Sequence, residues 1–504
     1  MPSDPDQHPS TGDPVDRVAI AGHARKSVRW VFWGRIVLQL VSLAFTFVLA
    51  RLLDPDAFGL YGMAFVILQL VNYVEALRLE SALIQAAEPS RDEVSAAWGF
   101  ALTFGAVCAG LTYGLSSACA SILEAPALAS LLRAGSLVFL VRAVFFPARV
   151  HLRRELRFRS LTLIEILRVV PSGLVAVWLA WSGFGAWALL AFYLLRELVG
   201  GLFMAVAAGP WKLPSARFGR IRTLLPFGVS SSTSELLIYG LYNAPDLFTG
   251  RFIGIAPLGN FRQGVALVNR PIAYVDDVLN KLAFPFLSRV WVDPDAVSAG
   301  FRRGLALLFA ITLPISVLTF VLADEFVRIL YGIQWNAAVP VVRIIAVAAV
   351  ARILHPLNSA VFHAAGRPST EVRLNLAGFV LLLTLLFVVR PDGIVAISYI
   401  VAGTWLLLAL VGLVFSSRTA FCSLADVLAA ARWPVVATAA MSAVTSLAAT
   451  LLNDVSLLLR TGGVAVVGLG TYLLVLSLLD RGLLKSAVST VFRRPGTKRE
   501  SDNG

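Results

Sequence analysis

Long apolar runs separated by short polar breaks make up most of this chain. Each run is about 20 residues or longer, the length that an α-helix needs to cross the hydrocarbon core of a bilayer. The breaks carry proline, glycine or charge, as in Asp54-Pro55-Asp56 and Gly209-Pro210-Trp211. The pattern predicts about fourteen membrane-spanning helices, near residues 29–52, 57–79, 94–119, 127–149, 161–182, 184–209, 225–250, 258–287, 303–323, 338–362, 370–389, 393–416, 433–452 and 459–480.

Composition supports this reading. Hydrophobic residues make up 58% of the 504 residues and charged residues 14%, against roughly 25% charged in an average soluble protein. The mean hydropathy is +0.79. A soluble fold has too little interior to bury that much apolar surface, so we predict an all-α polytopic membrane protein.

The positive charges are distributed unevenly about the predicted spans. The chain has 43 Lys and Arg against 30 Asp and Glu, a net charge of +13. Even-numbered connections and the two tails hold roughly 28 of the Lys and Arg, and the opposite side about five. Because positively charged loops stay in the cytoplasm, we expect both termini there. This topology also accounts for the net positive charge of the chain, so no nucleic-acid partner is expected.

The first half of the chain is repeated in the second. The stretch Ala50–Tyr61 recurs 200 residues later as Gly250–Phe261. Three further residues, at offsets of 210 and 209, recur in the same order: Arg133, Arg142 and Pro147 correspond to Arg343, Arg352 and Pro356. The repeat predicts two six-helix lobes in the same membrane orientation, an architecture suited to alternating access.

We therefore expect five parts: a disordered cytoplasmic tail over 1–28, an N-lobe over 29–210, a C-lobe over 211–416, two extra helices over 417–482, and a basic cytoplasmic tail over 483–504.

Arginines within the predicted spans are candidate phosphate ligands. A charge at a helix centre costs on the order of 3 kcal/mol, so it should face a partner or a cavity rather than lipid. Arginine's planar donor fork matches phosphate oxygens. The alternative is internal pairing, because Glu75 and Arg78, Glu165 and Arg168, and Asp277 and Lys281 have helical ion-pair spacing. The cavity candidates are Arg35, Arg78, Arg142, Arg270 and Arg352. We favour Arg35 and Arg270, neither of which has an opposite charge three or four residues away.

The seventh predicted span carries an unusually polar face. Glu235, Tyr239, Tyr242 and Asp246 follow helical spacing. This face could recognise sugar hydroxyls, with Glu235 or Asp246 as a proton or sodium site, or it could hydrogen-bond to neighbouring helices. In the eighth span, Asp277 shares a face with Arg270 and joins the candidate set.

Several chemistries find no support in the sequence. The three cysteines show no metal or disulfide spacing, and we interpret His355 and His363 as ordinary packing or interfacial residues. No phosphate-binding GxxxxGK[ST] loop and no nucleophile–base constellation is present. We therefore expect no enzyme activity, no metal and no cofactor, apart from a coupling ion that would be H⁺ or Na⁺.

Four segments resemble one family of bacterial exporters. The run Ala50–Tyr61 resembles its first extracytoplasmic turn, and Leu258–Phe261 with Phe284–Arg289 its "LGyY … fPalS" stretch. Leu330–Trp335 is similar to its "llfGxxW" turn, and Arg153–Phe158 to its "rrelrF" loop. In this order the segments resemble the Wzx-like polysaccharide flippases of the multidrug/oligosaccharidyl-lipid/polysaccharide (MOP) superfamily. Arg78 departs from the family, which usually has glycine there.

The resemblance implies a MOP/MATE-like fold and a flippase for undecaprenyl-pyrophosphate-linked oligosaccharide in the bacterial inner membrane, serving exopolysaccharide, capsule or lipopolysaccharide synthesis. Its implied partners are the lipid-linked glycan, membrane lipids, and a polysaccharide polymerase or export machinery. Two alternatives stay open: a multidrug/cation antiporter of the same superfamily, and a flippase for the peptidoglycan precursor lipid II. The intramembrane arginines argue against cationic drugs.

Overall fold

The computed structural model describes residues 34, 37–75, 80, 83–84, 90–155, 158–209, 213–217, 219, 225–452 and 454–485. It leaves out the side chains of 74–75, 158–159, 225–235 and 274–285. These described segments contain helices and connecting turns but no β-strand. The prediction of an all-α membrane protein is therefore confirmed.

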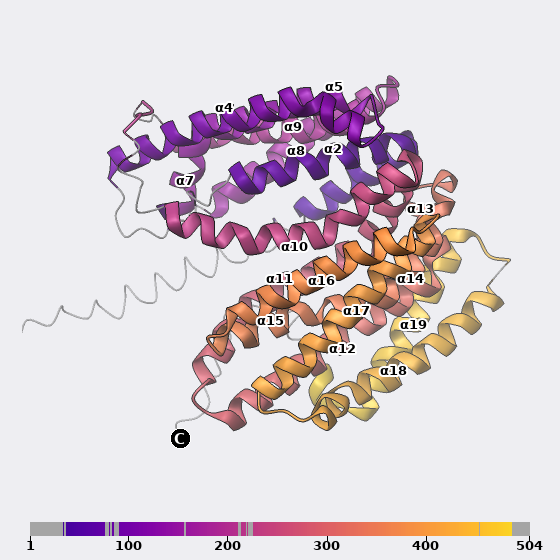
Figure 1. Cartoon of the computed structure of the whole chain (residues 1–504). Coiled ribbons are helices and arrows are strands. Elements are labelled where there is room, and N and C mark those ends of the chain that lie inside the picture. Colours follow the sequence, from indigo (N-terminus) through magenta and orange to yellow (C-terminus); the bar gives the residue numbers. More distant parts are fainter. Residues whose placement is uncertain are drawn as a thin grey trace, which may run out of the picture.

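The helices fall into two groups, drawn in indigo and purple and in pink to yellow (Figure 1). The first group, here called the N-lobe, begins with a helix over Val37–Leu52 and continues through α2 (Pro55–Glu75), α4 (Arg91–Ile122), α5 (Leu128–Gly135), α6 (Leu137–Val144), α7 (Phe146–Arg154), α8 (Phe158–Trp181) and α9 (Ala186–Ala208).

The second group, the C-lobe, runs through α10 (Leu225–Phe252), α11 (Ile255–Val290), α12 (Pro294–Val321), α13 (Ala323–Leu330), the 3₁₀ helix η2 (Ile333–Ala338), α14 (Val339–Arg352), α15 (Leu354–Ala364), α16 (Pro368–Val389) and α17 (Ile394–Thr419). Two further helices, α18 (Leu424–Leu451) and α19 (Leu457–Leu479), pack together and against α12. The residue boundaries of the five expected parts stay a prediction.

Local sequence signals start several of these helices. Ser90 and Glu93 form a reciprocal capping box at α4, and Ser423 and Asp426 form another at α18. Asp293 accepts the first amide hydrogens of α12. These caps satisfy N–H groups that have no partner within the helix, at the positions where the apolar runs begin.

One predicted span in each lobe contains an interruption of the helix. It is a sharp bend in the N-lobe, whereas in the C-lobe Ile333–Ala364 still counts as one candidate span. The span expected at 127–149 is three helices, with a bend of 49° between Leu128–Val144 and Phe146–Arg154. The span expected at 338–362 is α14 followed by α15. Pro147 and Pro356, which correspond in the repeat, lie just after these two breaks. Proline removes one helical hydrogen bond and crowds the preceding turn, so both lobes place a break at the same point.

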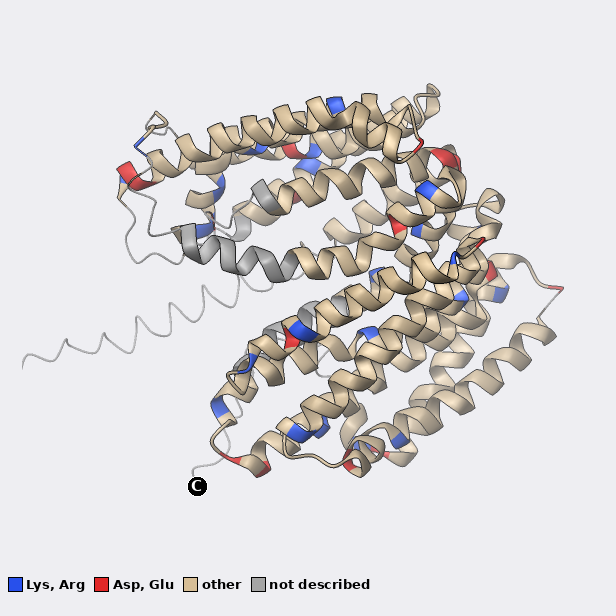
Figure 2. Ribbon diagram, in the orientation of Figure 1, with Lys and Arg blue, Asp and Glu red and all other residues tan. Residues whose placement is uncertain are grey.

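Among the described residues, nine helices are long and apolar enough to cross a membrane, or ten if the bent pair is one span. The exact number of fourteen stays a prediction. Their outer faces are apolar: Val206 is 83% exposed and Leu478 is 70% exposed. Such side chains are suited to lipid rather than water. The chain is a multi-pass membrane protein, and Figure 2 shows long stretches of helix without charge.

The two lobes contact each other mainly through α2, which packs against α10 and α11. In Figure 1 the lobes meet at the end where α13 lies and diverge toward the end where α7 lies. Each lobe has its own apolar core. Leu131 and Phe139 are fully buried in the N-lobe, and Phe301 and Trp335 in the C-lobe. The two lobes are therefore separate packing units joined at one end.

Candidate functional site

The repeated turns make reciprocal contacts at the end where the lobes meet. A Cβ atom placed on Gly59 would overlap the carbonyl oxygen of Ile255, and one placed on Gly259 would overlap that of Pro55. Gly59 and Gly259 correspond in the repeat, as do Pro55 and Ile255. The first turns of α2 and α11 therefore pack against each other around a pseudo-two-fold axis, and glycine at both positions allows the close approach.

Two corresponding arginines also cross between the lobes at this end. Arg51 of the N-lobe donates a hydrogen bond to the carbonyl oxygen of Ile329 in the C-lobe. Arg251 of the C-lobe pairs with Glu124 of the N-lobe at 2.7 Å. The approximate symmetry of the chain thus produces two matched polar links. We call this region, together with the two glycine turns, the closed end.

Side chains of η2 complete the closed end. The indole nitrogen of Trp335 donates to the carbonyl oxygen of Ala50 at 2.8 Å, and the amide nitrogen of Gln334 donates to the same oxygen at 3.1 Å. Trp335 is fully buried and packs edge-on against Phe58 with ring centroids 5.2 Å apart. The "llfGxxW" segment therefore joins the C-lobe to the first turn of the repeat.

Tyr239 and Asp246, two of the predicted residues on α10, lie at the contact between the lobes. The Tyr239 hydroxyl donates to the carbonyl oxygen of Val66 on α2 at 2.9 Å. The Asp246 carboxylate pairs with Arg262 of α11. Tyr239 thus confirms helix–helix hydrogen bonding for this member of the polar face.

Arg262 was missed by the sequence analysis. Its side chain lies over Gly62 of α2 and 5.9 Å from the ring centroid of Phe65. Gly62 is the residue that corresponds to Arg262 in the repeat. The N-lobe position has no side chain, so the guanidinium occupies the space across the axis. The repeat alignment, which pairs Arg262 with Gly62, is the sequence feature that could have indicated this residue.

Arg270 lies deeper in the contact region and turns toward the closed end. Its guanidinium donates to the Tyr331 hydroxyl at 3.5 Å. The fully buried Tyr331 ring packs against Phe47 of the N-lobe at 5.9 Å and against Trp335 at 6.0 Å. Arg270 is therefore connected to the aromatic cluster that holds the lobes together.

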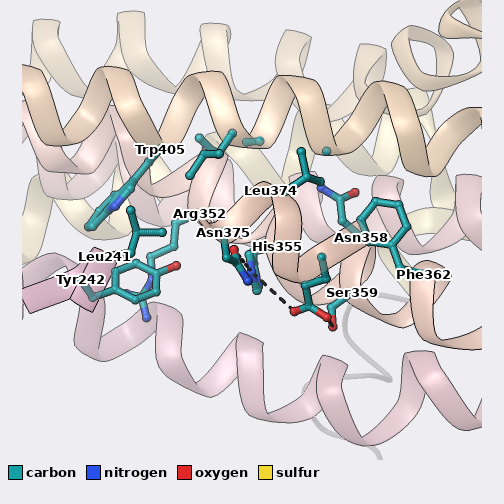
Figure 3. Close-up of a pocket in the computed structure, with 15 residues that line it drawn as sticks. Leu241, Tyr242, Arg352, His355, Asn358, Ser359, Phe362, Leu374, Asn375 and Trp405 are labelled. Atoms are coloured by element: carbon teal, nitrogen blue, oxygen red, sulfur yellow. Dashed lines mark hydrogen bonds and ion pairs between the residues drawn. The ribbon is translucent and has the colours of Figure 1, made fainter. Parts of the chain in front are cut away.

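A small pocket lies within the C-lobe, with mostly apolar walls and a few polar groups (Figure 3). The Arg352 guanidinium sits 5.2 Å from the ring centroid of Tyr242, whose ring lies 5.5 Å from that of Trp405. His355, Asn358, Ser359, Glu371 and Asn375 line the same pocket. Tyr242 therefore points into the C-lobe, whereas Tyr239, on the same predicted face, points at the N-lobe.

The two histidines lie near the same carboxylate. His363 contacts the Glu371 carboxylate at 3.0 Å, and His355 lies 3.8 Å from it. Their interpretation as packing or interfacial residues stays a prediction, and the shared carboxylate on the next helix was not foreseen from the sequence. The described residues hold no cluster of three or more His, Cys, Asp or Glu arranged to bind a metal.

A separate ionic cluster lies in the N-lobe. Arg168 pairs with Glu165 at 2.5 Å and with Glu197 of α9 at 3.5 Å. The predicted pairing of Glu165 with Arg168 is confirmed. Arg142, at the last turn of α6, is half-buried, and its carbonyl oxygen accepts a hydrogen bond from Arg149 at 2.8 Å.

The remaining candidates cannot be placed. Arg35 and Arg78 lie outside the described residues. Glu235 and Asp277 lie on α10 and α11, but their side chains are outside the described set. The structure thus brings Tyr239, Asp246 and Arg270 to the lobe contact, and Tyr242 and Arg352 to the C-lobe pocket. It does not join the two groups into one cavity.

Comparison with known proteins identifies the family. Residues 48–340, more than half of the chain, match the family of polysaccharide biosynthesis proteins. The chain belongs to this family. It is 26% identical over 274 residues to the teichuronic acid biosynthesis protein TuaB of Bacillus subtilis (strain 168), covering 51% of this chain and 56% of that protein. It is 22% identical over 334 residues to the lipopolysaccharide biosynthesis protein WzxC of Escherichia coli (strain K12), covering 66% and 68%.

The fold agrees with that assignment. A structure of the lipid II flippase MurJ in an inward closed conformation matches with a TM-score of 0.70 and 12% identity, covering 90% of this chain and 99% of that one. The match shows a common MurJ-like fold. The sequence matches to TuaB and WzxC span 56% and 68% of those relatives.

Proposed function

We propose that this polysaccharide biosynthesis protein flips lipid-linked oligosaccharide repeat units across the bacterial inner membrane. The observation that carries the proposal is the reciprocal contact of the two repeats at the closed end, around Gly59 and Gly259. Two lobes joined at one end and diverging at the other form one of the two states that alternating access requires. The names of the relatives, teichuronic acid and lipopolysaccharide biosynthesis proteins, fit a glycan cargo.

The distribution of Lys and Arg indicates which side of the membrane the diverging end of the lobes faces. The positive-inside rule puts the basic helix α7 and both chain termini on the cytoplasmic side. The closed end, with Arg51 and Arg251, then faces the extracytoplasmic side. The structure described here would admit substrate from the cytoplasm, and the links of the closed end would have to break for release.

Arginines at the lobe contact would hold the pyrophosphate. Among the described residues, Arg270 makes one long hydrogen bond, to Tyr331 at 3.5 Å, and Arg262 is paired with Asp246. A pyrophosphate would offer both guanidinium groups stronger, charge-assisted hydrogen bonds. Arg35 and Arg78 stay proposed ligands, with Glu235 and Asp277 as further polar candidates. Arg142, at the end of α6, and Arg352, in the separate C-lobe pocket, stay predictions from the sequence. The glycan would cross between the lobes while the lipid tail stays in the bilayer.

The energy source and partners belong to the same proposal. A coupling ion, H⁺ or Na⁺, would drive the return of the lobes, or removal of the product by a polymerase or export machinery would pull the reaction forward. Because the sequence shows no nucleophile–base constellation and no phosphate-binding GxxxxGK[ST] loop, the protein would act as a transporter rather than as an enzyme.

Complementation of a deletion strain tests this function. Wild type should restore surface polysaccharide, whereas Arg270→Ala should leave complete lipid-linked repeat units on the cytoplasmic leaflet. Arg418→Ala, at an exposed arginine near the end of α17, is the matched control and should complement. Normal polysaccharide in the deletion strain with altered drug sensitivity would favour the antiporter, and arrested peptidoglycan synthesis would favour a lipid II flippase.

A further inference from the structure

The C-lobe pocket is separate from the lobe contact and has its own titratable cluster. Its cavity volume is about 40 Å³, which is room for two or three water molecules and too little for a sugar ring. Residues of α10, α14, α15, α16 and α17 line it. The pocket therefore suits a small ligand rather than the glycan.

Glu371, on the first turn of α16, is the centre of the cluster. Its Oε2 atom accepts a hydrogen bond from the Ser359 hydroxyl at 2.9 Å and lies 3.0 Å from Nε2 of His363. Its Oε1 atom lies 3.8 Å from Nε2 of His355, and that nitrogen also lies 3.3 Å from Oδ1 of Asn375. The Glu371 side chain is 15% exposed. Two imidazoles thus lie near one largely buried carboxylate. Figure 3 shows His355, Ser359 and Asn375 in the pocket.

The surroundings favour a proton over a metal cation. From α14, Arg352 contributes a guanidinium to the pocket, and from α10, Tyr242 contributes a phenol. The described pocket residues of α17 carry no charge. The described charges on α11 and α12, which also pack against α15, do not line the pocket; they are Arg262, Arg270, Arg289, Asp295, Arg302 and Arg303. A permanent cation in the same pocket as the carboxylate opposes binding of a second one.

Water is expected in the pocket. Trp405 is 5% exposed, and its indole N–H finds no acceptor among the described residues. A buried donor without a partner costs free energy, and a water molecule in the adjacent cavity would accept from it. Such water would give protons a route to the histidines.

We propose that His355, His363 and Glu371 form a proton-binding site that couples the C-lobe to the transport cycle. The inference rests on the proposed transport function. Histidine changes charge near neutral pH, and a proton taken up here would be shared between imidazole and carboxylate. No covalent bond is formed or broken; one proton moves from water to the cluster and back.

The cluster is connected to the lobe contact through α10. Arg352 lies against Tyr242, and Tyr239, three residues earlier, donates to Val66 of the N-lobe. A Cβ atom on Gly240 would lie 2.9 Å from the Phe379 ring of α16, so α10 and α16 are closely packed. A charge change at Glu371 would therefore alter the packing of the helix that holds the two lobes together.

A distance measurement without substrate tests the site. Spin labels at Arg91→Cys and Val292→Cys, both exposed and on different lobes, report the diverging end; the three native cysteines are replaced by serine. In wild type the distance distribution should change between mildly acidic and mildly alkaline pH. Glu371→Gln and His363→Gln should each abolish this change.

The controls separate this proposal from its rivals. His151→Gln removes a histidine from an exposed pair with Glu155, at 2.9 Å, and should leave the pH response unchanged. Glu371→Asp keeps the carboxylate and should retain a response if Glu371→Gln fails to fold. A distribution that does not change with pH in wild type, or one that changes equally in the cluster variants, would overturn the proposal. A response to Na⁺ at constant pH would replace it with a sodium site. Because no substrate is present, failure here leaves the complementation result unaffected.

Discussion

Gly59 and Gly259 lie 200 residues apart in the chain, and each packs against the first residue of the helix that carries the other. The same relationship holds for Arg51 and Arg251, which each bind the opposite lobe. A repeated sequence thus produces an interface whose two halves are nearly equivalent. An opening motion of such an interface would break matched contacts on both sides of the pseudo-two-fold axis.

The glycine contact predicts that a larger side chain at Gly59 prevents closure. Gly59→Leu would overlap the backbone carbonyl of Ile255, which is the carbonyl of a helical residue and cannot move as a flexible side chain can. We expect the yield of a short thiol crosslink between Glu124→Cys and Arg251→Cys to fall severalfold. Gly110→Ala is the control, because no described atom lies within 4 Å of a Cβ atom there. Equal yields in both variants would contradict the packing described here.

The pair Arg251 and Glu124 predicts a charge-reversal effect at the closed end. Their side chains are 30% and 65% exposed, so the pair should contribute no more than about 1 kcal/mol to closure. Arg251→Glu alone should open the closed end, and Glu124→Arg in the same chain should restore it. Distances between spin labels at low and high salt measure the effect, which salt should weaken. Failure of the double reversal to restore closure would show that the pair is incidental.

The pair Asp246 and Arg262 predicts a larger effect on stability. Their side chains are 11% and 24% exposed. Asp246→Asn would leave the guanidinium without its counter-charge, which typically costs about 3–5 kcal/mol in a buried pair. Thermal unfolding in detergent should show a clear loss, and the double variant Asp246→Leu with Arg262→Met should recover much of it. If the double variant is less stable than Asp246→Asn, the two side chains stabilise the contact between α10 and α11 through packing or hydrogen bonds as well as through charge.

Two buried tryptophans offer a matched comparison. The Trp335 indole donates to the Ala50 carbonyl at 2.8 Å, whereas the Trp405 indole has no acceptor among the described residues. Replacement by phenylalanine should lower stability more at Trp335, where a hydrogen bond of about 1 kcal/mol is lost, than at Trp405. Thermal unfolding of both variants checks the order. A larger loss at Trp405 would mean that bound water contributes more than the direct bond.

Much of the fold could be predicted from local patterns. Apolar runs of bilayer length predicted the helices. A backbone segment in lipid must satisfy its hydrogen bonds internally, and an α-helix does so within one segment. Spacing alone identified Glu165 and Arg168 as a pair, since residues three apart share a helix face. The breaks at Pro147 and Pro356 were less visible, because proline within a span does not by itself say whether the helix bends or ends.

The sites were harder to predict, because they join residues from different helices. The spacing of Tyr239 and Tyr242 placed them on one polar face, yet one contacts Val66 in the N-lobe and the other faces Trp405 in the C-lobe. A difference of three residues is about 60° around a helix, which is enough to point two side chains at different neighbours.

By itself the sequence determined that the chain lies in a lipid bilayer and where its helices run. It also determined that the chain is duplicated and that its positive charges are unevenly distributed. Each of these properties depends on composition or on residues near one another in the chain. Only the tertiary structure decided which partners the buried polar groups have. Arg262 with Asp246, and Glu371 with His355 and His363, meet across helices. Burial of polar groups requires that such partners be found, but the identity of each partner follows from how the helices pack.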